Sequence, residues 1–178
     1  MDWQTDYRSK RVSADEAVRV ISSGRRVFLQ GGCGVPQTLE AALVRRGPHL
    51  RDVEIVHTRS GGKAEYCKPE YQGRLRHNAF FIGPNARWAV NCGLADFTPA
   101  WLSEIPGILR GQLPIDVALV HLSPPDEHGF CSFGVSVFSR EADRLCAGAS
   151  LSLGYERLDW VPTPFMGCRR WQSAEWRG

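Results

Sequence analysis

Short apolar runs alternate along this chain with segments of helical character, and glycine or proline stands between them. The clearest run is Asp116–Leu122 (DVALVHL), which predicts a buried strand. Further strands are expected at residues 27–29, 53–56 and 79–82, with additional candidates at 88–90 and 133–137. The alternation favours βαβ units, and therefore an α/β fold with a mainly parallel sheet flanked by helices.

Three helices are expected, one at residues 13–24 before the first strand and two between later strands, at residues 36–47 and 98–105. Each begins with residue types typical of a helix start. Ser13 and Glu16 have the spacing of a capping box, Pro36 suits a first helical position, and Thr98 precedes Pro99. Glycine or proline follows each segment and is expected to end the helix there.

The composition is that of an ordinary globular domain. The chain has 178 residues, of which 43% are hydrophobic, and a formal net charge of +3. These values exclude disorder for most of the chain, and the length suits one domain. No run of about 18 apolar residues is present, and residues 1–11 (MDWQTDYRSKR) lack the apolar core of a secretory signal. With 22 basic and 19 acidic residues, we expect a cytoplasmic protein without a membrane or nucleic-acid partner.

The cysteines do not indicate a metal site. No two of the six are close enough for a C-x-x-C pair, and the histidines are scattered. Structural zinc sites usually draw two ligands from one short turn, so we expect no metal here. Without an export signal a disulfide framework is not expected either. We therefore predict reduced thiols and no metal or redox cofactor.

A glycine-rich turn follows the first expected strand. Gly31–Gly34 (GGCG) precedes Pro36, so backbone N–H groups and a helix N-terminus would face the same point. Such a junction can bind a phosphate or a carboxylate. It lacks the third glycine of a dinucleotide fingerprint and the Gly-Lys-Ser/Thr of a P-loop. The alternative is a tight turn without a ligand, and the residues alone do not separate the two.

A second polar motif follows the DVALVHL strand. Ser123–Gly129 (SPPDEHG) places a hydroxyl, two carboxylates and an imidazole in a turn stiffened by two prolines. His128 could act as an acid or base, with Asp126 orienting it. The alternative is a capped turn with solvated charges, since neighbours in sequence often point apart.

Several single residues have weaker claims to a function. Glu104 would have a raised pKa if it were buried, but an end-of-helix acid paired with an arginine is the more ordinary interpretation. Cys33 could be activated by the nearby helix N-terminus, yet no base accompanies it, so we expect it to be inert. His57, His77 and His121 are expected to be hydrogen-bonded structural residues.

Four segments occur in the order of a known family. They are Asn78–Pro84 (NAFFIGP) with Asn85 and Arg87, Gly93–Asp96 (GLAD), Leu102–Pro106 (LSEIP) and Leu113–Val137 (LPIDVALVHLSPPDEHGFCSFGVSV). Together they resemble the N-terminal domain of the acetyl-CoA hydrolase/transferase family, which includes acetate and 4-hydroxybutyrate CoA-transferases. The resemblance covers Val12 to Val137.

The resemblance implies covalent catalysis on an acyl-CoA. Family members have two similar α/β domains with the active site between them, and they move coenzyme A between carboxylic acids or hydrolyse the thioester. A glutamate attacks the acyl-CoA carbonyl, which gives an acyl–glutamyl anhydride and then a glutamyl-CoA thioester. That glutamate and most coenzyme A contacts belong to the second domain, so no catalytic residue is expected here. Glu104 and Glu127 match positions of the first domain.

What the resemblance does imply for this chain is a wall of the acyl pocket. Its expected substrate-binding residues are Gly31 and Gly34 at one strand end, and Ser123, Pro125, Asp126, His128 and Gly129 at the other.

The chain is expected to divide at Val137. Residues 1–137 would form a truncated CoA-transferase-like N-terminal domain, and residues 138–178 an atypical tail. Family resemblance and periodicity stop together at this point, which is what translation out of frame would produce. The alternative is an irregular extension that packs against the sheet or a partner.

Three functions stay open. The chain could be the amino-terminal half of an enzyme with coenzyme A as substrate, inactive until a second domain or complementary chain joins it. It could be a non-catalytic fragment that self-associates through its exposed face. It could also be a stand-alone module that binds a small anion at Gly31–Gly34. A sugar-phosphate isomerase of similar architecture is a further alternative, but no set of residues points to it.

Overall fold

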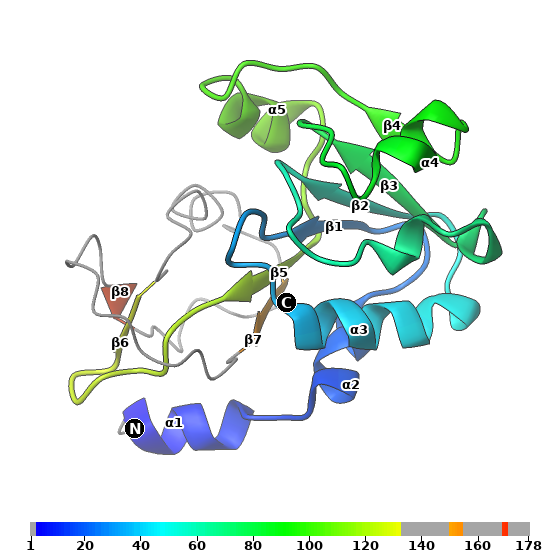
Figure 1. Cartoon of the computed structure of the whole chain (residues 1–178). Coiled ribbons are helices and arrows are strands. Elements are labelled where there is room, and N and C mark those ends of the chain that lie inside the picture. Colours follow the sequence, from blue (N-terminus) through cyan, green and yellow to red (C-terminus); the bar gives the residue numbers. More distant parts are fainter. Residues whose placement is uncertain (1–2, 133–149, 155–168, 171–178) are drawn as a thin grey trace.

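The computed structural model describes residues 3–132, 150–154 and 169–170 (Figure 1). Its centre is a six-stranded sheet with the order β4-β3-β2-β1-β5-β7, in which every neighbouring pair is parallel. The strands are β1 (Arg26–Leu29), β2 (Val53–His57), β3 (Leu75–Ala79), β4 (Ala95–Phe97), β5 (Val117–His121) and β7 (Ser150–Gly154). A separate antiparallel pair joins β6 (Phe130–Cys131) to β8 (Arg169–Arg170). The expected parallel α/β fold is confirmed.

Helices cover both faces of the sheet. The helices of the described residues are α1 (Trp3–Lys10), α2 (Ala14–Ala17), α3 (Gln37–Arg46), α4 (Arg87–Asn91) and α5 (Ile105–Gly111), with short 3-10 helices at Val18–Val20, Gly47–His49, Glu65–Cys67 and Pro69–Tyr71. Figure 1 shows α2 and α3 on one side of the sheet and α5 on the other. This arrangement buries apolar side chains on both faces of the central strands.

The packing of strand β5 on both faces explains why its sequence is almost continuously apolar. Val117 and Leu119 pack into the core formed with α2, α3 and α4, whereas Ala118 and Val120 pack into the core formed with α5. Successive side chains of a strand point to opposite faces, so a strand covered on both sides needs apolar residues at every position. Its neighbour β1 follows the same rule, with Phe28 on the α5 face and Leu29 on the other.

The capping box at the start of α2 is confirmed. The Ser13 Oγ accepts a hydrogen bond from the Glu16 N–H at 3.2 Å, and the Ser13 N–H donates to the Glu16 carboxylate at 3.1 Å. Hydrogen bonds from the side chain and backbone of Ser13 lower the pKa of Glu16. The α-helix is nevertheless short, because the chain continues as a 3-10 helix over Val18–Val20.

We expect Ser13→Ala to lower the free energy of unfolding by about 1 kcal/mol, because it leaves a helix N-terminal N–H group without its acceptor. Urea unfolding monitored by circular dichroism measures the change. Ser22→Ala is the matched control, since Ser22 is also exposed and contributes no cap. Equal midpoints for the two variants would contradict a stabilising role of this cap.

Three expected elements between residues 79 and 105 were placed wrongly. The third strand covers Leu75–Ala79, and the apolar residues 80–82 follow it as a loop. The strand lacks a continuous apolar pattern because its buried residues include the polar His77 and Asn78. Residues 88–90 lie in the helix α4 instead of a strand, because so short an apolar run fits either period. Pro106 lies in the first turn of α5 and does not end a preceding helix, so α5 begins at Ile105.

Helix α1 and strand β4 were not expected from the sequence. The strand expected at 133–137 lies outside the described residues, as does most of the segment 138–178.

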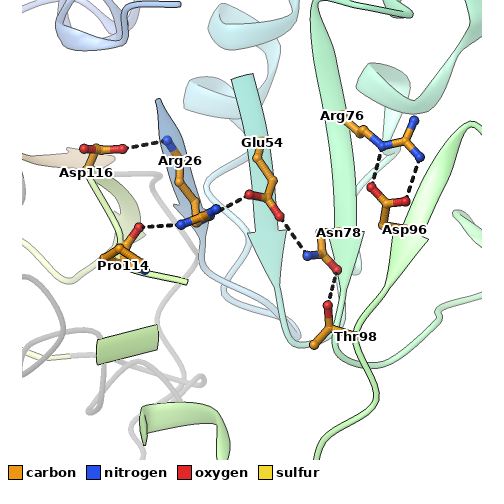
Figure 2. Close-up of polar contacts among 8 residues, drawn as sticks. All are labelled: Arg26, Glu54, Arg76, Asn78, Asp96, Thr98, Pro114 and Asp116. Atoms are coloured by element: carbon orange, nitrogen blue, oxygen red, sulfur yellow. Dashed lines mark hydrogen bonds and ion pairs between the residues drawn. The ribbon is translucent and has the colours of Figure 1, made fainter. Parts of the chain in front are cut away.

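A row of polar contacts crosses the face of the sheet that α5 covers (Figure 2). The Arg26 Nε lies 2.6 Å from the Glu54 carboxylate, and the Asn78 amide donates to the same carboxylate at 2.7 Å. The Thr98 hydroxyl then donates to the Asn78 Oδ1 at 2.8 Å. At the other end, Asp116 accepts the Arg26 backbone N–H at 2.8 Å. These residues link the three neighbouring strands β1, β2 and β3 to the residue that precedes β5 and to the start of the connection between β4 and α5.

Candidate functional site

The carboxyl ends of β1 to β5 meet at one edge of the sheet, because these strands are parallel. In open α/β sheets this edge is where ligands bind. The loops that leave it begin at residues 30, 58, 80, 98 and 122. Both motifs singled out in the sequence lie here, on the adjacent strands β1 and β5.

The loops after β1 and β2 are joined. The Gly32 N–H donates to the Arg59 carbonyl at 2.6 Å, and Gly32 pairs with Ser60 in an isolated parallel bridge. A methyl group at Gly31 would lie 2.5 Å from the Arg59 carbonyl oxygen and 2.8 Å from the Thr58 Oγ1. Gly32 itself has a φ of +67°. Close packing and backbone conformation thus explain glycine at 31 and 32, while Gly34 is buried in the same turn.

A buried carboxylate supports the loop after β2. Glu40, in the first turn of α3, is only 5% exposed and accepts the Ala64 N–H at 3.0 Å. A methyl group at Gly62 would collide with the same carboxylate. The Ser60 Oγ accepts the Gly62 N–H at 3.0 Å, and the Asn85 amide donates to the Gly62 carbonyl at 2.8 Å. The loop is therefore held from α3 on one side and from the loop after β3 on the other.

Two buried histidines lie on the strands next to this loop. The ring centroids of His57 and His77 are 4.3 Å apart, and those of His77 and Tyr66 are 5.5 Å apart. The expectation that both histidines are hydrogen-bonded was wrong, because none of their ring nitrogens has a partner among the described residues. Burial, and then the charge of His77, hold the pKa of His57 well below its usual range. Burial also lowers the pKa of His77 to about 4, against a smaller opposing effect of Asp96.

The same cluster raises the pKa of two weak acids. Burial, followed by the charge of Glu40, raises the pKa of Cys67 to about 12 and that of Tyr66 well above its usual range. The histidines are neutral near pH 7, and the thiol and phenol stay protonated. This buried cluster supports the loop and provides no general base.

The Ser123–Gly129 turn is organised by Asp126. One carboxylate oxygen accepts the backbone N–H groups of His128 and Phe130, each at 2.9 Å, and these bonds help to lower the pKa of Asp126, with that of Phe130 the largest cause. The carboxylate therefore contacts the backbone of His128, and the exposed imidazole lies near Glu127 at 3.4 Å. This geometry is that of the capped turn. Asp126 does not orient the His128 ring as the catalytic interpretation requires.

The remaining residues of this motif belong to the same turn. The Ser123 Oγ accepts the Ser132 N–H at 2.9 Å, and Gly129 has a φ of +82°. Pro125, which lies between Ser123 and Gly129 in the sequence, is half-buried. The first residue after β1 contacts the last residue of β5, because the His121 N–H donates to the Gln30 side chain. The two motifs thus leave the sheet side by side.

Glu104 and Cys33 provide no catalytic pair. Glu104 is exposed, and its carboxylate accepts the Trp101 N–H at 2.8 Å in the turn before α5, so it is not a buried acid. Cys33 is an exposed free thiol. Within the part of the chain that the structure describes, no three His, Cys, Asp or Glu side chains are grouped to hold a metal ion, and no helix there is long and apolar enough to cross a membrane.

Sequence reasoning missed Glu40, the contact of Asn85 with the Gly62 carbonyl, and the role of residues 58–64. The one signal for the last was Gly61–Gly62, which follows the second strand as Gly31–Gly34 follows the first.

A parallel sheet with helices on both faces and glycine-rich loops at its carboxyl edge defines an α/β domain, a class in which ligands commonly bind at that edge. The chain belongs to the acetyl-CoA hydrolase/transferase family, whose N-terminal domain it matches over residues 1–146. The matched range ends past Val137 and short of the chain's last residue.

Relatives and solved structures agree with this assignment. The chain is 44% identical over 137 residues to a 4-hydroxybutyrate coenzyme A transferase of Clostridium kluyveri, a match that covers 76% of this chain and 32% of the relative. It is 37% identical over 128 residues to a succinyl-CoA:acetate/propanoyl-CoA:succinate CoA transferase of Fasciola hepatica, covering 70% and 26%. The chain thus spans about a third or less of these relatives.

The fold is that of two solved structures. RipA from Yersinia pestis superposes with a TM-score of 0.79 at 18% identity, covering 94% of this chain and 47% of RipA. A 4-hydroxybutyrate CoA-transferase from Porphyromonas gingivalis superposes with a TM-score of 0.67 at 24% identity, covering 90% of this chain and 43% of the transferase.

Proposed function

We propose that this chain is the amino-terminal half of an enzyme that transfers coenzyme A between an acyl-CoA and a small carboxylic acid, or hydrolyses the acyl-CoA. The observation that carries the proposal is the 44% identity to a CoA transferase of which the chain spans only 32%. In this family the attacking glutamate lies in the second domain. We therefore also propose that this chain is inactive alone. The complete enzyme would use coenzyme A as a substrate and would need no metal or redox cofactor.

The proposed acyl-pocket wall consists of Gly31, Gly34, Ser123, Pro125, Asp126, His128 and Gly129. The position of these residues supports their assignment to the pocket wall, because the segments that contain them follow the adjacent parallel strands β1 and β5 at the carboxyl edge. Gly31 and Asp126 act in this proposal through the backbone: Gly31 lets two loops approach, and Asp126 fixes the turn that presents Ser123 and His128. A cytoplasmic location, expected from the sequence, stays part of the proposal.

The proposed partners are a second domain or complementary chain, and a second copy of this chain. Phe97, Trp101 and Leu102 support an association, because they are 46%, 78% and 46% exposed around the connection between β4 and α5. Exposed apolar patches of this kind often mark interfaces. Sedimentation velocity of the purified chain tests self-association; a monomer at every concentration would contradict it. We also keep the proposed division of the chain into residues 1–137 and an atypical segment 138–178.

A complementation assay tests the enzymatic function. The full chain is assayed with acetyl-CoA and 4-hydroxybutyrate, alone and with a separately produced chain that comprises the unmatched remainder of the Clostridium kluyveri relative. We expect no acyl exchange with either chain alone and measurable exchange with both. Exchange by this chain alone would contradict the inactive half, and no exchange by a mixture that co-elutes as a complex would contradict the enzyme.

A further inference from the structure

Two histidines lie in the core of the sheet without hydrogen-bond partners for their rings. His57 and His77 are 1% and 0% exposed, and their ring centroids are 4.3 Å apart. They belong to the neighbouring strands β2 and β3, and none of their four ring nitrogens is hydrogen-bonded within the part of the chain that the structure describes. Buried polar groups in native proteins are almost always hydrogen-bonded, so an unpartnered pair of this kind calls for a physical explanation.

Residues 58–71, here named the covering segment, pack over this pair. The Tyr66 ring is 1% exposed and its centroid lies 5.5 Å from that of His77, while the neighbouring Cys67 is buried in the same core. The covering segment contains neither a strand nor an α-helix, only the 3-10 helices Glu65–Cys67 and Pro69–Tyr71. Segments with so little regular structure open at a lower free energy than the strands of a sheet.

The two sides of the cluster are held with unequal strength. Strands β2 and β3 each pair with a strand on both edges, so the histidines cannot leave the sheet without breaking its ladders. The covering segment is attached by separate hydrogen bonds, such as that from the Ala64 N–H to the Glu40 carboxylate. Ala64 also has a φ of +51°, a left-handed conformation that costs free energy in a residue other than glycine and that opening would release.

The groups around the histidine pair do not offset the cost of a buried positive charge. The titratable groups in the cluster are Tyr66 and Cys67 from the covering segment, Glu40 from α3 and Asp96 from β4. The charge of Asp96 favours a protonated His77, but burial outweighs it and lowers the pKa of His77 to about 4. A protonated imidazole has two N–H donors, and water can accept both once the cluster is open.

We propose that proton uptake by the His57–His77 pair opens the covering segment while the sheet beneath it stays folded. The proton comes from solvent and binds a ring nitrogen, and opening lets water reach both rings. The same movement withdraws the Arg59 carbonyl from the Gly32 N–H, so it loosens the carboxyl edge at the glycine-rich turn. The chain is thereby able to lose this edge in acid through a local change, whichever ligand the edge binds.

Hydrogen exchange of the full chain at pH 7.5, 6.0 and 5.0 tests the proposal. Mass spectrometry follows peptides from the covering segment and, for the sheet, peptides from β1 and β5. Dividing the intrinsic exchange rate at each pH by the measured rate gives the protection factor. His77→Phe removes one proton site and His57→Leu removes the other, while His49→Gln removes an exposed histidine as the matched control. Circular dichroism spectra verify that the variants are folded.

We expect the protection factor of the covering segment to fall at least about 25-fold between pH 7.5 and 5.0. A pKa of about 4 in the closed cluster and about 6.5 in the open segment gives this change for His77 alone. At every pH the covering segment should be at least about tenfold less protected than β1 and β5, because it opens while the sheet is folded. Both core variants should show a smaller change with pH than the wild type, and His49→Gln should show the full change.

Three results would overturn the proposal. The first is a protection factor of the covering segment that does not change between pH 7.5 and 5.0. The second is equal protection of the covering segment and the sheet, which would mean that the cluster opens only when the whole domain unfolds. The third is a wild-type response to pH in both His77→Phe and His57→Leu. None of these measurements requires a ligand or a partner chain, so the proposed function is tested separately.

Discussion

Replacing Gly31 by alanine is expected to lower the free energy of unfolding by about 1–3 kcal/mol, the usual cost of overpacking a close contact. The added methyl group would lie 2.5 Å from the Arg59 carbonyl oxygen. A backbone carbonyl cannot rotate away as a flexible side chain can, and this carbonyl accepts the Gly32 N–H. Either the hydrogen bond breaks or the two loops separate. Urea unfolding measures the loss, and hydrogen exchange at Gly32 reports whether the loops have moved apart.

Gly107→Ala is the matched control for this prediction. Gly107 lies in α5 with open space around the position of a methyl group, so alanine there should leave stability unchanged or raise it by up to about 1 kcal/mol. If Gly31→Ala were as stable as this control, the close approach of the loops would not be a constraint on the fold.

Acidification is expected to destabilise the protein well before its carboxylates are protonated. Both buried histidines have a lowered pKa in the folded state, so the unfolded chain takes up protons first as the pH falls below about 6.5. The free energy of unfolding is therefore not reduced by these histidines above that pH. It falls progressively as the pH drops toward their folded-state pKa, which is about 4 for His77. For His77 alone this amounts to about 3 kcal/mol, at about 1.4 kcal/mol per pH unit.

Urea unfolding at pH 7.5, 6.0 and 5.0 checks the acid sensitivity. His77→Phe should reduce the pH dependence and leave the part that His57 contributes, because the ring that replaces His77 takes up no proton in either state. His49→Gln is the control, since His49 is exposed and its loss should leave the slope unchanged. A wild-type stability that does not fall between pH 7.5 and 5.0 would contradict the burial of uncharged histidines.

Features that depend on neighbours in sequence were predictable. The capping box at Ser13, the DVALVHL strand and the parallel sheet all follow from local patterns. Strand β3 was misplaced because two of its buried residues are polar, His77 and Asn78, and periodicity counts only apolar positions. The start of α5 was misplaced because proline both ends and begins helices.

The candidate site was predictable only in part. Strand ends and glycines drew attention to Gly31 and to the turn at Asp126, and the structure places both at one edge of the sheet. The residues that hold this edge together could not be found in the same way. Glu40 contacts Ala64 and Asn85 contacts Gly62 across long stretches of chain. Such pairings depend on the tertiary fold, and no local pattern encodes them.

The polar row across the sheet has a consequence for how the strands find their alignment. In a parallel sheet a shift by one residue moves every side chain of the strand to the opposite face. Val56 lies directly opposite Asn78 in the observed pairing of β2 with β3, and Asn78 reaches the Glu54 carboxylate on the same face. A shift of β3 by one position would turn Asn78 toward the apolar core and leave Glu54 with one partner fewer. The polar row therefore favours a single register for strands that come from distant parts of the chain.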